Sequence, residues 1–132
     1  MNRGTIASIV DLVRPAEGEI VVEIGPGKGA LTDALVARLQ RLVAVEIDRD
    51  LVPRLRERYA SQTNIHIHEQ DALTLALEEI YPAGRVVLVG NLPYNISTPL
   101  MIHLLAQRDR IDRMVFMAVS YTHLTLPTTP YV

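Results

Sequence analysis

The 132-residue chain contains no cysteine, and its single lysine is Lys28. The absence of cysteine excludes disulfide scaffolds, cysteine-ligated zinc and thiol nucleophiles. No apolar run reaches the roughly 18 residues that a membrane-spanning helix needs, and residues 1–14 lack the pattern of a secretory signal. Length and composition therefore predict one small soluble domain of the cytoplasm, without membrane association.

Positive charge is also scarce. The 13 lysine and arginine residues are outnumbered by 15 acidic ones, so the formal net charge is −2. A protein that binds nucleic acid on its own usually has a basic surplus, because neutralising phosphates supplies much of its affinity. A role in RNA binding would therefore need basic surface from elsewhere.

Short apolar runs alternate with amphipathic stretches along the chain. The run at residues 20–24 ends in a glycine cluster, which is typical of a buried parallel strand. Asp50 is placed to cap a helix, and Thr98 and Pro99 are placed to open one. Strands separated by helices predict an α/β fold with an open parallel sheet, whose ligands bind beyond the carboxyl ends of the strands. We expect strands at 20–24, 42–46, 64–68, 85–90 and 113–117, and helices at 31–39, 50–59 and 98–106.

Three alternate glycines, Gly25, Gly27 and Gly29, follow the first predicted strand. Glycine lets the backbone turn sharply and approach a ligand where a side chain would clash, and the next helix offers unpaired N–H groups. The spacing departs from the G-x-G-x-x-G pattern of dinucleotide-binding proteins, because Ala30 stands at the third position. The cluster predicts either a ligand-binding turn or a tight connection without a ligand.

Acidic residues lie at the end of the second predicted strand and just past the third. A carboxylate at Glu46 can accept hydrogen bonds from both hydroxyls of a ribose; the alternative is a solvated acid at a strand end. Asp71, within Gln70-Asp71-Ala72, is placed to accept a hydrogen bond from an adenine amino group, although alone it is typical of a turn or cap. With the glycines, these acids predict a nucleoside cofactor bound across three strand ends.

An unusual polar segment stands at the end of the fourth predicted strand: Gly90-Asn-Leu-Pro-Tyr-Asn95. Pro93 biases Leu92 toward an extended conformation, so that the Leu92 carbonyl can point into a pocket. The Asn91 side-chain oxygen is a second acceptor, and two convergent acceptors suit an NH₂ group. Tyr94 offers an aromatic face to a base, a contact worth about 1–3 kcal/mol. The alternative is a loop with a buried tyrosine.

Four segments of the chain resemble the ribosomal RNA adenine dimethyltransferases: residues 23–32, 45–50, 70–72 and, most specifically, 90–101. Within that family the sequence is most similar to the small-subunit type, which dimethylates two adjacent adenines near the 3′ end of the RNA. The resemblance covers residues 4 to 117. It implies a class I S-adenosylmethionine-dependent methyltransferase fold, with a Rossmann-like and mostly parallel sheet.

The resemblance also implies a cofactor, a substrate and a cofactor site. The cofactor is S-adenosylmethionine, and the substrate is ribosomal RNA in an immature small subunit. The reaction needs no metal, and the intact enzyme is a monomer. The implied cofactor-binding residues are Gly25 and Gly27 beneath the methionine part, Glu46 at the ribose, Asp71 and Ala72 at the adenine, and Asn91 between the cofactor and the target base.

The implied catalytic residues are Asn91, Leu92, Pro93 and Tyr94. The nucleophile is the N6 amine of adenine, whose lone pair is delocalised into the ring. Acceptors at Asn91 and Leu92 can draw on its N–H bonds and favour an sp³-like nitrogen in the transition state. The target adenine must be splayed from its stack, with Tyr94 replacing the lost stacking.

Two departures from the family pattern concern the ends of the chain. Nothing before Thr5 resembles the basic arm with a Gln-Asn-Phe-Leu segment that family members carry. Nothing after Met117 resembles the closing strands and the helical RNA-binding domain. We therefore expect residues 1–117 to form a partial, incomplete catalytic domain with impaired activity, and residues 118–132 to be a non-native or disordered tail. An exposed fifth strand predicts marginal stability or self-association.

Three alternatives remain for the function. The continuation 98–101 argues against a large-subunit adenine methylase of the macrolide-resistance type. The missing third glycine and the segment 90–95 argue against an NAD-dependent dehydrogenase. The third alternative is a non-catalytic remnant that binds only cofactor or RNA.

Two further side-chain groups have less specific patterns. His66 and His68 alternate on one predicted strand, but a third metal ligand at a suitable spacing is missing, which favours exposed strand residues. We expect a solvated helix face at three arginines of the second predicted helix, Arg54, Arg56 and Arg58. The alternative is an RNA-binding patch.

Overall fold

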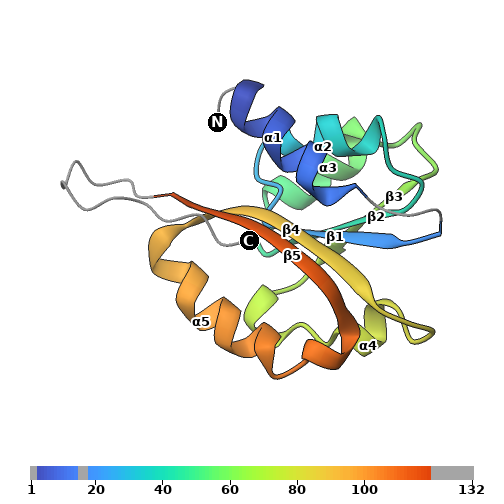
Figure 1. Ribbon diagram of the computed structural model, residues 1–132. Coiled ribbons are helices and arrows are strands. Elements are labelled where there is room, and N and C mark those ends of the chain that lie inside the picture. The colour runs from blue at the N-terminus through green and yellow to red at the C-terminus, as the bar shows by residue number, and fades with distance from the viewer. Residues whose placement is uncertain (1–2, 15–17, 120–132) are drawn as a thin grey trace.

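The computed structural model describes residues 3–14 and 18–119, with the side chains at 3, 5, 93–97, 118 and 119 left outside the description. Five strands pair in parallel in the order β3-β2-β1-β4-β5 (Figure 1). The strands are β1 Ile20–Ile24, β2 Leu42–Glu46, β3 Ile65–Glu69, β4 Val86–Pro93 and β5 Ile111–Val119. The helices are α1 Arg3–Val13, α2 Ala30–Val36, α3 Leu51–Arg58, α4 Leu77–Ile80 and α5 Tyr94–Leu105, with short 3₁₀ turns η1 Ala72–Thr74 and η2 Arg108–Arg110.

Helices cover both faces of the sheet: α1, α2 and α3 lie over one face, and α4 and α5 over the other (Figure 1). Beneath α5, a buried cluster includes Leu88 and Phe116 from the sheet and Leu104 from the helix. On the opposite face, Val21 and Leu35 belong to the cluster that packs α1 and α2 against the strands. Burial on both faces explains why β1, β2 and β4, the inner strands, are almost continuously apolar, whereas the edge strand β3 alternates apolar and polar residues.

The central position of β1 places the candidate site. Every residue of β1 is buried, and β1 pairs with β2 on one side and β4 on the other. The strand order therefore reverses between β1 and β4, which is where an open α/β sheet leaves a crevice at its carboxyl end. The predicted parallel α/β sheet is confirmed.

Two predicted boundaries in the segment 90–101 are wrong. Strand β4 does not end at Gly90 but runs through Pro93, because β5 continues to pair with it, from Asn91 opposite Met117 onward. Helix α5 begins at Tyr94, before the expected start at Thr98, and holds Pro99 inside it. A proline inside a helix removes one backbone hydrogen bond. Burial of α5 side chains against the sheet offsets that loss.

The predicted cap of α3 is also corrected. Asp48, not Asp50, supplies the capping carboxylate: its Oδ1 accepts hydrogen bonds from the N–H groups of Asp50 at 2.8 Å and Leu51 at 3.3 Å. The side chain of Asp50 makes no capping bond. Asp48 is better placed because its own backbone carbonyl also accepts the Leu51 N–H, at 3.2 Å.

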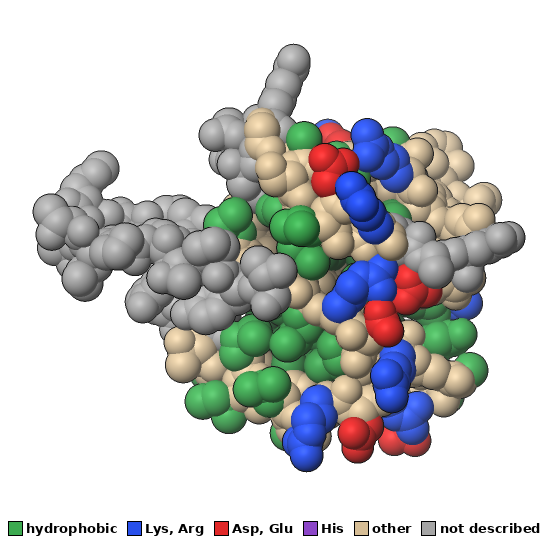
Figure 2. Space-filling model, viewed as in Figure 1, with side chains coloured by type: hydrophobic (Ala, Val, Ile, Leu, Met, Phe, Trp, Pro, Cys, Tyr) green, Lys and Arg blue, Asp and Glu red, His purple; other side chains and the backbone are tan. Residues whose placement is uncertain are grey.

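Hydrophobic side chains gather over β5 and α5, with charged side chains of both signs beside them (Figure 2). Helix α5 exposes two large aliphatic residues, Ile102 and Leu105. In the described ranges, none of the helices is both long and apolar enough to cross a membrane.

Candidate functional site

The turn between β1 and α2 depends on glycine at three positions. Gly25, Gly27 and Gly29 have positive φ angles of 70°, 58° and 95°, a region that residues with a Cβ rarely adopt. The Gly25 N–H donates to the Val45 carbonyl at 2.9 Å, which ties the turn to the end of β2. We call residues 25–29 the glycine turn.

The last two of these glycines have different surroundings. A Cβ on Gly29 would lie 2.7 Å from the Tyr59 hydroxyl, whereas a Cβ on Gly27 would have no atom within 4 Å. Gly29 thus allows close packing between the glycine turn and the end of α3. Gly27 presents its backbone to open space, where a ligand can approach it.

Glu46 ends β2 beside the glycine turn and is only 7% exposed. Its Oε1 accepts a hydrogen bond from the Gly27 N–H at 3.0 Å, and its Oε2 accepts from the N–H groups of Ile47 and Asp48 at 3.0 and 3.1 Å. The alternative of a solvated acid is therefore wrong. A carboxylate has about four acceptor positions, so Glu46 can still accept from a ligand hydroxyl.

Asp71 lies just beyond β3 and is half-buried. Its Oδ1 accepts a hydrogen bond from the Leu73 N–H at 2.9 Å and so caps η1, which is the cap role that the sequence left open. Ala72 begins η1 and packs against the buried cluster beneath α5. The Gln70 N–H donates to the Glu46 carbonyl at 3.0 Å, which holds this segment against the end of β2.

Asn91 lies at the carboxyl end of β4, one residue after Gly90, which pairs with Ile24 of β1. A Cβ on Gly90 would lie 2.8 Å from the Ile24 carbonyl oxygen, so glycine allows the two strands to approach closely. The Asn91 Oδ1 is buried, and no described residue hydrogen-bonds to it. An unpartnered buried polar atom costs about 1–3 kcal/mol unless a ligand or water pairs with it. This atom therefore marks a position where a donor group can bind.

The residues after Asn91 are described unevenly. Leu92 is buried, and its Cδ2 lies 3.5 Å from the position of a Cβ on Gly25, so it packs against the glycine turn. The side chains of Pro93 and Tyr94 lie outside the described part of the chain. Their predicted roles stay predictions.

Sequence reasoning missed Glu23 as a candidate. Its side chain is 1% exposed, and its Oε1 accepts a hydrogen bond from the Thr32 hydroxyl at 2.5 Å. Burial raises the pKa of Glu23 to about 7; the Thr32 bond opposes this shift, whereas the nearby charges of Glu46 and Asp33 add to it. The available signal was an acid within the otherwise apolar run of β1.

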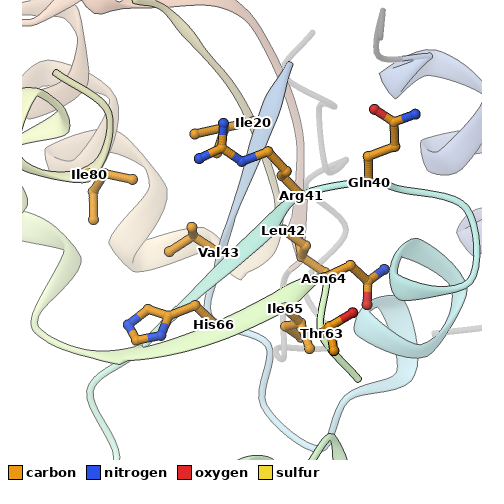
Figure 3. A pocket seen from close by; sticks show the side chains of 10 residues that line it. All are labelled: Ile20, Gln40, Arg41, Leu42, Val43, Thr63, Asn64, Ile65, His66 and Ile80. Atoms are coloured by element: carbon orange, nitrogen blue, oxygen red, sulfur yellow. The ribbon is translucent and has the colours of Figure 1, made fainter. Parts of the chain in front are cut away.

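The cleft in Figure 3 lies at the opposite end of the sheet. It has a volume of about 200 Å³ and is lined by the starts of β1, β2 and β3, together with Ile80 of α4 (Figure 3). None of the predicted cofactor or catalytic residues lines it. His66 does line it, but the described residues contain no group of three histidine or acidic side chains that could hold a metal ion.

Two of the three arginines on α3 make contacts within the protein. Arg56 donates to the Ile67 carbonyl at 3.3 Å, and Arg58 forms an ion pair with Asp33. These contacts favour the solvated helix face over an RNA-binding patch.

Comparison with known proteins identifies the family. The family described as Ribosomal RNA adenine dimethylase matches residues 1–130. The chain belongs to this family. It is 54% identical over 112 residues to the Ribosomal RNA small subunit methyltransferase A of Aromatoleum aromaticum, a match that covers 85% of this chain and 41% of that relative. The chain thus spans about two fifths of the length of such curated relatives.

Solved structures confirm the class I methyltransferase fold of this adenine dimethylase family member. The 23S rRNA methyltransferase ErmE superposes with a TM-score of 0.73 at 29% identity, covering 91% of this chain and 46% of ErmE. A dimethyladenosine transferase from Plasmodium falciparum also gives 0.73, at 28% identity, covering 89% of this chain and 42% of that chain.

These matches bear on two of the three alternatives. The fold is shared with the large-subunit type, but the identity is higher to a relative named for the small subunit, 54% against 29%. Membership of the adenine dimethylase family decides against the NAD-dependent dehydrogenase.

Proposed function

We propose that this chain carries the cofactor site and reaction centre of a small-subunit rRNA adenine N6,N6-dimethyltransferase. It transfers methyl groups from S-adenosylmethionine to the N6 amines of two adjacent adenines near the 3′ end of the RNA. The observation that carries this proposal is the buried, unpartnered Oδ1 of Asn91 at the point where β4 meets the glycine turn. In a member of this family, an acceptor there suits an adenine amino group.

The residues present fit S-adenosylmethionine. Gly27 offers open backbone for the methionine part. Glu46, which already accepts three backbone N–H bonds, has one acceptor position left for a ribose hydroxyl. Ile47, the next residue, is 60% exposed and gives an apolar surface for the adenine ring. Asp71 uses Oδ1 as a cap, which leaves Oδ2 to accept from the adenine amino group.

The reaction centre has to improve a poor nucleophile. When bound, S-adenosylmethionine supplies a methyl group on a positively charged sulfur. Asn91 Oδ1 and the Leu92 carbonyl accept hydrogen bonds from the adenine amine and favour the sp³-like nitrogen of the transition state. We expect the Tyr94 ring to stack on the splayed adenine. The methylated amine is acidic and loses its proton to water, so neither a metal nor a dedicated base is required.

The substrate sets the expected context. The protein meets the RNA in an immature small subunit in the cytoplasm, and it acts as a monomer. Because the net charge of this chain is −2, we expect its own affinity for RNA to be weak.

The test is methyl transfer from labelled S-adenosylmethionine to immature small subunits. We expect label on two adjacent adenines, and its loss in Asn91→Ala. A matched control is Gln62→Ala, which removes an exposed amide after α3. Label on the large subunit would favour the macrolide-resistance type, and cofactor binding without transfer would favour a non-catalytic remnant.

A further inference from the structure

We propose that Glu23 is a positioning residue that releases a proton to solvent when a cationic cofactor binds at the glycine turn. The inference rests on the proposed function, because the cation is S-adenosylmethionine. In the step, the O–H bond of the Glu23 carboxylic acid breaks, the proton goes to water, and the electron pair stays on the carboxylate. No other bond changes.

The position of Glu23 couples its charge to the glycine turn. Glu23 lies two residues before Gly25, between its register partners Ala44 of β2 and Val89 of β4. Its hydrogen bond to Thr32, which is fully buried in α2, joins β1 two residues before the glycine turn to α2 three residues after it. A change of charge at Glu23 therefore acts on both ends of the loop that would contact the cofactor.

The surroundings of Glu23 disfavour its charged form. Glu46 of β2 and Asp33 of α2 add negative charge nearby. Tyr59, which follows α3, is within electrostatic range of Glu23 and donates its hydroxyl hydrogen bond to Asp33. Arg58 is paired with Asp33, and the partner on β4, Val89, carries no charge. Burial raises the pKa of Glu23 to about 7, so a modest added positive charge suffices to move the proton.

The exchange gives the site a means of telling cofactor from product. S-adenosylmethionine carries a sulfonium charge, whereas S-adenosylhomocysteine has a neutral sulfur. A carboxylate at Glu23 stabilises the charged molecule and contributes less to the neutral one. We therefore expect the product to bind with release of fewer protons. Because the Glu23 carboxylate contributes less to binding of the product, the product should dissociate more easily than the cofactor.

The test is calorimetric titration of the 132-residue chain with each ligand at pH 7, in two buffers that differ in ionisation enthalpy. With the Glu23 pKa near 7, S-adenosylmethionine should release about half a proton. Glu23→Gln should still bind but release none. The affinity of the unmodified chain for S-adenosylmethionine, divided by that of Glu23→Gln at the same pH, should fall about tenfold from pH 8 to pH 6. Glu57→Gln, an exposed acid on α3, should behave like the unmodified chain.

A second pair of variants makes the test independent of whether Glu23→Gln folds. Thr32→Val removes the hydrogen bond that lowers the Glu23 pKa, so it should move the pH midpoint of binding upward, and Thr32→Ser should restore it. A carbon-13 NMR titration of the glutamates follows the same shift without ligand. Binding with no proton release overturns this inference alone. No binding of S-adenosylmethionine at any pH overturns the proposed cofactor as well.

Discussion

The Glu46 carboxylate accepts a hydrogen bond from the Gly27 N–H at 3.0 Å, so the acid that ends β2 holds the turn that follows β1. The same carboxylate accepts from the N–H groups of Ile47 and Asp48. One buried side chain therefore organises two neighbouring strand ends. A site built this way is formed before any ligand arrives, which lowers the cost of binding.

Glu46 should contribute to stability as well as to binding. Glu46→Ala leaves three backbone N–H groups without their acceptor, and we expect a loss of about 1–3 kcal/mol in the free energy of unfolding. Glu46→Gln keeps one acceptor oxygen and should lose less. Denaturant unfolding measures both, and equal stability of all three proteins would contradict the role of Glu46 as an organiser.

We expect different outcomes for two similar substitutions in the glycine turn. Gly29→Ala places a Cβ 2.7 Å from the Tyr59 hydroxyl, so it should destabilise the fold, with partial rescue by Tyr59→Phe. Gly27→Ala meets no atom within 4 Å; it should destabilise less, through its positive φ alone, yet weaken cofactor binding. Thermal unfolding and ligand titration of the same variants separate these effects. A Gly27→Ala protein with unchanged affinity would argue against a ligand at this backbone.

Asn91 should show a conflict between stability and function. Asn91→Leu replaces a buried amide oxygen that has no partner among the described residues with an apolar group of similar size. We expect stability that is unchanged or raised by up to about 1–3 kcal/mol, together with loss of methyl transfer. Denaturant unfolding and transfer assays on one preparation give both values. A marked loss of stability would mean that Asn91 has a structural partner instead.

Glu23 predicts a pH dependence of folding that needs no ligand. Its pKa rises from 4.5 in the unfolded chain to about 7 in the folded one, so between these values the folded state holds the proton more tightly. Stability from this group is complete below about pH 4.5 and is lost as the pH rises toward 7. The difference in unfolding free energy between the unmodified chain and Glu23→Gln should therefore change across this window and level off above it. A constant difference would show that Glu23 is not protonated in the fold.

The sequence predicted the parts of the fold that depend on local pattern. The five strands and their parallel arrangement follow from apolar runs separated by helical segments. The helix at Arg3–Val13 was missed, although its apolar residues Ile6, Ile9, Val10 and Val13 recur at helical spacing. The apolar side of this helix packs on the sheet, a tertiary contact that the sequence pattern alone does not show.

The parts of the site that sequence reasoning missed depend on tertiary contacts. The extension of β4 through Pro93 comes from pairing with β5, and the capping role of Asp48 comes from backbone geometry. Burial of Glu23 against Thr32 joins residues on a strand and a helix. None of these follows from the spacing of residues along the chain. The sequence could name the residues at the strand ends, but only the fold shows which of them touch.

The measurement that tests the central claim most directly is a calorimetric titration of the chain with S-adenosylmethionine, using NAD as the control ligand. We predict specific binding of S-adenosylmethionine that is lost in Glu46→Ala and kept in Arg41→Ala, which alters the cleft at the other end of the sheet. Binding of NAD instead, or binding of S-adenosylmethionine that Arg41→Ala abolishes and Glu46→Ala does not, would contradict a cofactor site at the glycine turn.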